Sequence, residues 1–236
     1  MTVDMREVWV YLSGSPLLAL VLTLTAYQLA ITFYERCNRH PLANPVAIAV
    51  LLVAGAISVI GMPYATYFQG AQFVHFLLGT ATVALAVPIY KGLRAAIRRA
   101  VPMLVALACG GTTSIVVGVG LARLMGVDAT VVGGLYAKSV TAPIGMGVAE
   151  RIHVSPTLTA VFAVFTGVLG AVIARYLLDW LGVKAWWQRG FALGVAAHGI
   201  GTSRAFTVNT EAGVYAGLGM GLHGILGAVL LPFFLR

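Results

Sequence analysis

Residues 41–90 read PLANPVAIAVLLVAGAISVIGMPYATYFQGAQFVHFLLGTATVALAVPIY, and no Asp, Glu, Lys or Arg occurs among them. A helix needs roughly 20 apolar residues to cross the hydrocarbon layer of a membrane, so this stretch has room for two crossings. Four further stretches without a charged side chain are each long enough for one crossing: 8–34, 100–122, 152–174 and 212–235. The pattern predicts a chain that passes through a lipid bilayer several times.

The whole-chain composition agrees with that prediction. Hydrophobic residues make up 60% of the 236 and charged residues only 9%, whereas a soluble domain carries about 25% charged residues. The mean hydropathy is +0.94. The 15 basic residues exceed the 7 acidic ones, but they flank apolar stretches and form no stripe on a soluble face, so nucleic acid is not an expected partner.

Soluble-enzyme chemistry and cofactor binding are not expected. Cys37 and Cys109 form no metal or disulfide pattern, and the chain contains no convincing P-loop, zinc spacing or nucleophile elbow. An intramembrane hydrolase is disfavoured because nothing places a serine and a base at matched positions. Residues 1–34 lack the basic start of a signal peptide, and their apolar part is too long for one, so we expect a first span that is retained.

The expected fold class is an all-α integral membrane protein forming one transmembrane domain over residues 1–236. Two apolar inserts, 128–151 and 189–211, are broken by Gly, Pro, Ser and Thr. Such breaks are tolerated at membrane depth where the freed backbone groups are buried in protein or face water. We therefore expect two broken or re-entrant helical segments in addition to about six transmembrane helices. The six are expected at about 8–33, 44–62, 71–90, 100–124, 157–181 and 210–234.

The distribution of basic residues favours re-entrant inserts. If both inserts return to the side that they entered from, nine basic residues lie on the side of the basic loops 35–41 and 91–99, against four on the other side. If both inserts cross, the division is about seven against six. The positive-inside rule therefore favours re-entry, with both chain ends outside the cytoplasm. One span then separates the inserts, which predicts an inverted repeat of the kind that frames transporter binding sites.

Lys138 and Arg204 are the two basic residues that do not lie at segment ends, since each falls near the middle of a broken insert. A charge at membrane depth costs at least about 2.5–3.5 kcal/mol on insertion scales and therefore indicates a functional site. Two cations indicate an anionic ligand, which we expect them to bind across a common polar cavity. The alternative is that each charge is paired internally or extends to the membrane surface.

The neighbouring residues suit the same ligand. Half-helix ends, glycines and hydroxyls could orient an anion, although Ser, Thr and Gly in membrane helices often serve packing alone. His198 is a candidate proton carrier for symport, whereas His75 and His223 lie on apolar spans and are expected to be packed or hydrogen-bonded to a neighbouring helix. The candidate substrate-binding residues are Lys138, Ser139, Thr141, Pro143, His198, Gly199, Gly201, Thr202, Ser203 and Arg204. No metal site and no catalytic residue are expected among them.

The segments KSVTAPI (138–144) and AHGIGTSRA (197–205) resemble the signature segments of the LrgB/CidB family, and the likeness extends from about residue 44 to the C-terminus. Small differences from the family pattern occur at Ala142, Ala197 and Ser203. The resemblance implies two functions. Bacterial members are described as antiholin-like proteins that modulate murein hydrolase export and cell lysis with a small LrgA/CidA-type membrane partner. A related plastid protein is a glycolate/glycerate transporter, and some bacterial pairs are linked to pyruvate.

Taken with the two broken inserts, the resemblance predicts a multi-pass transporter of small monocarboxylates in the inner (plasma) membrane. The substrate would be of the glycolate, glycerate, pyruvate or lactate type, with H⁺ or Na⁺ as a possible coupling ion. The alternative is the antiholin-like regulator, which has no substrate of its own. Small-residue spacings in 213–227 also indicate close helix contacts inside the subunit or in a homo-oligomer.

Overall fold

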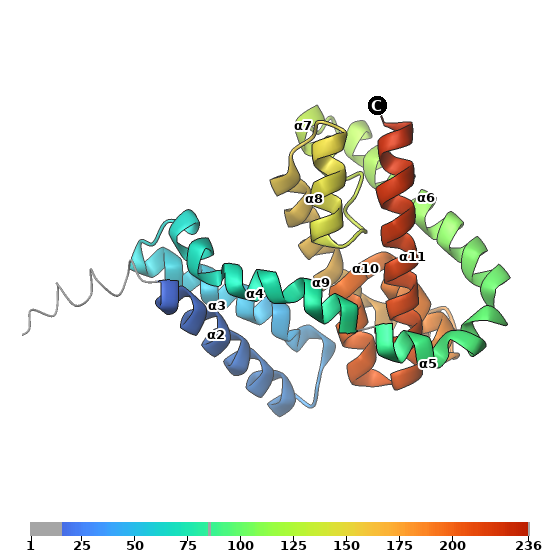
Figure 1. The fold of residues 1–236 in the computed structure, drawn as a ribbon, viewed down its shortest axis with the longest axis horizontal. Coiled ribbons are helices and arrows are strands. Elements are labelled where there is room, and N and C mark those ends of the chain that lie inside the picture. The colour runs from blue at the N-terminus through green and yellow to red at the C-terminus, as the bar shows by residue number, and fades with distance from the viewer. Residues whose placement is uncertain (1–15, 85, 236) are drawn as a thin grey trace, which may run out of the picture. The chain divides into compact units, whose positions relative to one another are not determined.

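The computed structural model describes residues 16–84 and 86–235, and every regular element in those residues is a helix (Figure 1). The chain divides into two compact units, Met1–Ala86 and Val87–Arg236. The expected outward N-terminus and the start of the first expected span fall on residues 1–15, which lie outside the described residues. The side chain of His75 is also outside the described part of the structure.

The first unit contains three helices whose ends follow from local sequence. They are α2 (Pro16–Arg36), α3 (Pro45–Ile60) and α4 (Tyr64–Ala84), with a 3₁₀ turn, η1 (Pro41–Ala43), before α3. Asn44 caps α3, because its side-chain oxygen accepts hydrogen bonds from the backbone N–H groups of Val46 and Ala47. Gly61 ends α3 in the left-handed conformation, with φ 71°.

The third expected span, over about 71–90, falls on α4 and the first residues of α5 (Ala86–Ile97). Leu85, between these two helices, lies outside the described residues. The structure therefore places helix on both sides of Leu85 within the expected range, and the helical run begins earlier than expected, at Tyr64.

The second unit is a bundle around one C-terminal helix. α11 (Thr210–Phe234) contacts α6, α8 and α10, and α9 contacts α7, α8 and α10 (Figure 1). The remaining bounds are α6 (Ala100–Leu124), α7 (Ala129–Gly134), α8 (Ala142–Arg151), α9 (Pro156–Trp180) and α10 (Trp186–Val208).

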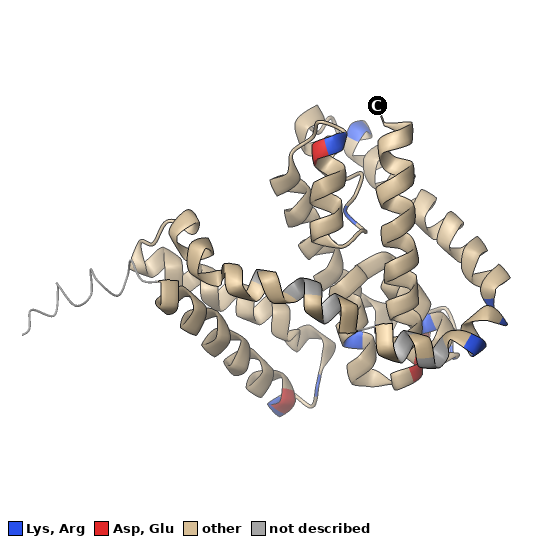
Figure 2. Cartoon of the chain, in the orientation of Figure 1, with Lys and Arg blue, Asp and Glu red and all other residues tan. Residues whose placement is uncertain are grey.

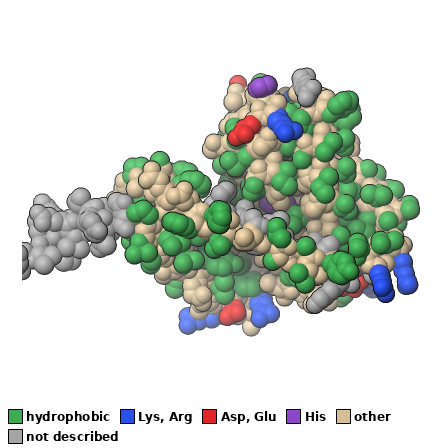
Figure 3. All heavy atoms as spheres, in the orientation of Figure 1, with side chains coloured by type: hydrophobic (Ala, Val, Ile, Leu, Met, Phe, Trp, Pro, Cys, Tyr) green, Lys and Arg blue, Asp and Glu red, His purple; other side chains and the backbone are tan. Residues whose placement is uncertain are grey.

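Four of the described helices are long and apolar enough to cross a membrane: α2, α6, α9 and α11. α3 is apolar but shorter, so the expected number of six full-length spans is not confirmed. Large apolar side chains such as Val116, Phe165 and Ile225 are each more than 60% exposed. Figure 3 shows hydrophobic side chains over much of the visible surface, which suits contact with lipid better than contact with water.

Both expected interruptions are present in the second unit. The first is the non-helical stretch 135–141 between α7 and α8, and Thr141 precedes the first turn of α8. The second is a sharp break inside α10 at His198, where φ is 40° and ψ is −129°. α10 folds back there, and a contact between its two halves shows this. A Cβ on Gly201 would lie 2.7 Å from the carbonyl oxygen of Leu193. In a continuous helix two residues eight apart are separated by about 12 Å.

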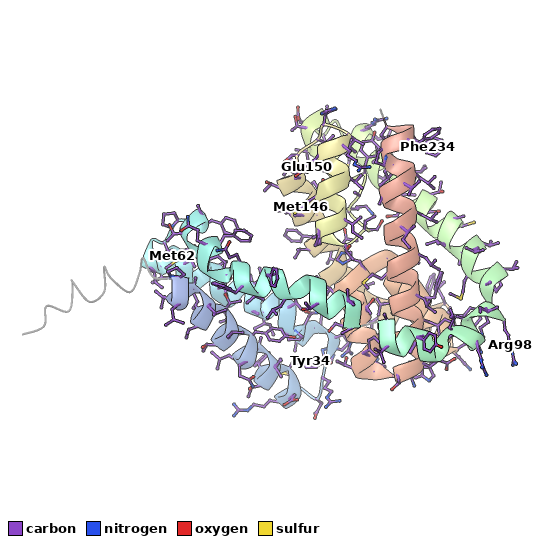
Figure 4. All side chains as sticks on the ribbon, viewed as in Figure 1. Tyr34, Met62, Arg98, Met146, Glu150 and Phe234 are labelled. Atoms are coloured by element: carbon purple, nitrogen blue, oxygen red, sulfur yellow. The ribbon has the colours of Figure 1, made fainter. Side chains whose placement is uncertain are left out.

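Each insert begins and ends at the same end of the bundle, as a re-entrant segment does. Gly133, near the start of the first insert, lies against Val154, which follows that insert. Gly190, near the start of the second insert, lies against Ala212, which follows the second insert. Figure 4 shows Glu150 and Phe234 at one end of the second unit and Arg98 at the other. The charged residues of this unit gather mainly at its two ends (Figure 2). The inverted repeat itself stays a prediction.

Candidate functional site

The two interruptions meet at the middle of α11. From the first interruption, Ser139 places its hydroxyl oxygen 3.1 Å from Nε2 of His223. From the second, Thr202 places its hydroxyl oxygen 3.8 Å from the sulfur of Met220. Met220 and His223 are three residues apart and therefore lie on the same face of the helix. The tips of both broken segments thus contact one short stretch of α11.

Lys138 begins a chain of polar contacts through this region. Its ammonium donates to the hydroxyl of Ser114 on α6 at 2.6 Å, and that hydroxyl donates to Ser139 at 3.2 Å. Ser139 in turn contacts His223, so four side chains from α6, the first interruption and α11 are linked. Because Ser139 accepts from Ser114, its own proton is free to be donated to the histidine ring.

One face of α6 makes room for this chain. A Cβ at Gly118 would lie 2.8 Å from Cε of Lys138, and a Cβ at Gly111 would lie 3.0 Å from Cε1 of His223. Gly111, Ser114 and Gly118 are spaced by three and four residues, which places them on one helix face. The sequence reasoning did not single out this face, although the spacing of two glycines around a serine was a signal that could have found it.

A cavity of about 640 Å³ adjoins the polar chain. Its walls come from α6, α9 and the first half of α10, and they are mainly apolar side chains such as Met103, Phe191 and Val195. Ser114 and Lys138 also line it, and Lys138 is the charged residue in the lining that the structure describes. An apolar cavity with one cationic group is suited to a small organic anion.

His198 and Thr202 hold the second interruption in place. Nε2 of His198 donates to the backbone carbonyl of Ala163 on α9 at 2.8 Å. The His198 carbonyl accepts from the hydroxyl of Thr202 at 2.8 Å. Gly167 of α9 gives the imidazole its space, since a Cβ there would lie 2.8 Å from Cε1 of His198. These contacts fix the break in α10, and the proton-carrier role of His198 stays a prediction.

Arg204 does not join Lys138. It lines a separate cavity of about 390 Å³ together with Arg175, Asp179 and Arg189. Neither of these two cavities has both Lys138 and Arg204 among its described lining residues, and a cavity common to the two stays a prediction. The fold-back of α10 accounts for the two separate linings, because six residues of helix carry Arg204 about 9 Å along the axis from the break at His198.

The remaining predicted site residues lie outside the polar chain. Gly201 is buried where the two halves of α10 touch, and Ser203 is exposed. Thr141 is half-buried before α8 and makes no capping hydrogen bond with its side chain. Pro143 is exposed in the first turn of α8, and Gly199 lies near Met220. None of these five is among the described residues that line either cavity.

The apolar helices and the two interrupted segments define a polytopic helical membrane protein. The LrgB-like family matches residues 23–236, so the chain belongs to that family. It is 31% identical to the uncharacterized protein YwbG of Bacillus subtilis, over 93% of this chain and 97% of that protein. It is 28% identical to the holin-like protein CidB of Staphylococcus aureus, over 92% of this chain and 94% of that protein. No solved structure matches the chain significantly.

Proposed function

We propose that the chain is a secondary carrier of small monocarboxylates, of the glycolate, glycerate, pyruvate or lactate type, in the bacterial inner membrane. One observation supports this most directly. Lys138 lies at the tip of an interrupted segment, lines a mainly apolar cavity, and is hydrogen-bonded to the neutral side chain of Ser114. A positive charge in such a place is suited to an anion, and discontinuous helices frame substrate sites in transporters.

In this mechanism the carboxylate of the substrate accepts hydrogen bonds from the N–H groups of the Lys138 ammonium that do not donate to Ser114. A charge-assisted hydrogen bond is roughly twice as strong as a neutral one, so Lys138 supplies most of the affinity. The apolar walls of the cavity contact the short carbon chain of the substrate. The interrupted segments move between states that open the cavity to either side of the membrane. The substrate leaves unchanged, so no catalytic residue is assigned.

Of the two candidate coupling ions, H⁺ and Na⁺, the side chains beside the cavity favour H⁺. Entry of a monocarboxylate together with one H⁺ or one Na⁺ moves no net charge, so charge balance does not separate the two ions. The chain from Lys138 to His223 contains an imidazole that can hold a proton, and this favours H⁺. Arg204 has no direct substrate contact in this mechanism, because it lines the other cavity.

The experiment is uptake of radiolabelled glycolate, glycerate, pyruvate and lactate by the purified protein in proteoliposomes. Lys138→Gln removes the charge and leaves a polar side chain that is one bond shorter, and we expect it to lower uptake more than about tenfold, the factor for ~1.4 kcal/mol. Lys138→Arg keeps the charge and should retain part of the activity. Lys184→Gln removes an exposed charge that lines neither cavity, so it is the matched control. Wild-type protein that takes up none of the four acids, or full uptake by Lys138→Gln, would contradict the carrier.

A second candidate function is control of a small LrgA/CidA-type membrane partner, as an antiholin-like regulator. The observation that favours it is that relatives over most of the chain are named holin-like protein CidB. This function predicts that the chain co-purifies with the partner and alters lysis of the host cell. It also predicts that Lys138→Gln leaves both effects intact, because a lipid-facing helix surface and not the cavity would bind the partner. We include in this second proposal a helix surface through which copies of the chain associate as a homo-oligomer.

A further inference from the structure

The cavity beside Lys138 is larger than a two- or three-carbon acid needs. Its volume is about 640 Å³, within the range of roughly 300–1,000 Å³ that proteins use for drug-sized ligands. The walls are mainly apolar, so water in the remaining space would find few hydrogen-bond partners. A longer carbon chain would fill this space and bury its methylene groups against the walls. The size and the chemistry of the cavity therefore fit an acid with a longer chain.

The cavity is elongated, and its cation lies at one end. On α6 the lining runs from Ser114, which Lys138 contacts, to Pro102. These positions are twelve residues apart, so the lining spans about 18 Å at 1.5 Å per residue of helix. On α10 the lining is a stripe of two rows with a spacing of four residues. The rows are Trp187, Phe191 and Val195, and Gln188, Ala192 and Ala196.

The helices α6 and α10 run side by side along this length. Towards the Lys138 end, a Cβ at Gly110 would lie 3.7 Å from Cγ1 of Val195. At the other end, Cζ of Arg99 lies 4.9 Å from the centroid of the Trp187 ring. Between these ends the described lining residues carry no charge. A chain whose carboxylate lies at Lys138 would therefore extend along both helices towards Trp187.

We propose that the cavity binds medium-chain monocarboxylates, with the carboxylate on Lys138 and the alkyl chain between α6 and α10. An extended chain of ten carbons is about 11 Å long at ~1.2 Å per bond, so it fits within the length of the lining. Lys138 is the charged residue in the lining that the structure describes, and one cation matches one carboxylate. This inference rests on the proposed carboxylate site and names a longer substrate class for it.

The experiment compares the binding of butanoate and decanoate to the detergent-purified full chain. Tryptophan fluorescence is the readout, because Trp187 lines the cavity. Ala106 is exposed on α6 and lines the cavity about 12 Å along the helix from Ser114, where the decanoate chain ends. Ala106→Phe should displace at least two methylene groups of decanoate. Each buried methylene group contributes about fourfold in affinity, the factor for ~0.8 kcal/mol. The dissociation constant for decanoate should therefore rise more than about tenfold, and that for butanoate much less.

Two further variants and a neutral ligand complete the test. Ala108→Phe is the matched control, because Ala108 is exposed on α6 but is not among the described residues that line the cavity. It should keep both wild-type dissociation constants. Ala192→Phe adds the same bulk from α10, at an exposed lining position, and should repeat the selective loss of decanoate. Partitioning of an acid into detergent is the same for every variant, so it cancels in these ratios. Decanol tests the charge, since Lys138→Gln should weaken decanoate more than decanol.

The outcomes separate this inference from the proposed function. A loss confined to decanoate in Ala106→Phe and Ala192→Phe supports the longer substrate. The same change for both acids in these variants, or no change, overturns it, and the carboxylate site still stands if Lys138→Gln weakens butanoate. Binding of both acids that Lys138→Gln leaves intact contradicts the carboxylate site itself. Wild-type protein that binds decanol as tightly as decanoate also overturns the inference, because the cavity would then accept any alkyl chain.

Discussion

The ammonium of Lys138 lies 2.6 Å from the hydroxyl of Ser114, so a positive charge inside the fold is held by a neutral side chain. Among the described residues, the ion pairs involve Arg99, Arg175 and Arg189, and none includes Lys138. A partly buried cation without a counter-ion costs free energy that an anionic ligand would recover. This relationship is the physical basis of the proposed carboxylate site.

Gly118 gives the first prediction, because its missing side chain leaves space for Lys138. A Cβ at position 118 would come within 2.8 Å of Cε of Lys138. The lysine stem is flexible, so we expect Gly118→Val to move the ammonium away from Ser114 without unfolding the protein. Carboxylate uptake in proteoliposomes should fall about tenfold, the factor for ~1.4 kcal/mol, while the melting temperature changes little.

Gly120→Val is the control for that variant. Gly120 lies on the same helix, and a Cβ there meets nothing within 4 Å. It should retain the wild-type uptake. Equal loss of uptake in both variants would show that valine disturbs α6 itself and that the position of Lys138 is not the cause.

The sequence predicted the apolar helices well where charge-free stretches are bounded by charged or capping residues. α6, α9 and α11 lie close to the expected ranges, and both interruptions were recognised from their Gly, Pro and Ser content. The span expected at 71–90 falls on α4 and the start of α5, and the structure does not describe Leu85 between them. The helix begins earlier than expected, at Tyr64, because the aromatic residues assigned to a turn belong to its first turns.

The site was predicted less completely than the fold. Charge at depth drew attention to Lys138 and Arg204, which line two different cavities, but linear spacing cannot say where a chain folds back. The break at His198 requires one residue with φ 40°, and an amino-acid pattern does not predict such a backbone angle. The partners Ser114 and His223 come from α6 and α11, 24 and 85 residues from Lys138, and only tertiary packing brings them together.

The strained backbone at His198 gives a prediction on stability. His198→Ala loses the hydrogen bond to Ala163 and keeps a non-glycine residue at φ 40°, so it should lower the thermal stability. His198→Gly loses the same bond but relieves the strain, so it should be more stable than the alanine variant by ~1 kcal/mol. Thermal unfolding in detergent compares the two. A glycine variant less stable than the alanine variant would mean that the break in α10 is not strained.

Asp128 gives a prediction on pH dependence. It caps α7, and hydrogen bonding to the side chain and backbone N–H of Thr130 lowers the pKa of its carboxyl below the ordinary value. A carboxyl whose pKa is lowered by folding stabilises the protein above its unfolded pKa of about 3.9, and this contribution is lost as the pH falls through the folded pKa. Asp128→Asn can cap the helix without titrating. Its stability should therefore depend less on pH below about 4 than that of the wild type, and identical pH profiles would contradict this role.

Gly190 gives the last prediction, because it sets the distance between α10 and α11. A Cβ on Gly190 would overlap the backbone carbonyl of Ala212, and a carbonyl cannot turn aside as a side-chain end can. Gly190→Ala should therefore force the two helices apart at a cost of ~1–3 kcal/mol, seen as a lower melting temperature. Gly221→Ala is the matched control, since it lies on α11 where a Cβ meets nothing within 4 Å and should gain slightly from the better helix propensity of alanine. If Gly190→Ala were as stable as Gly221→Ala, the close contact between the first half of α10 and α11 would be contradicted. The geometry that brings both interruptions to Met220 and His223 would then be contradicted as well.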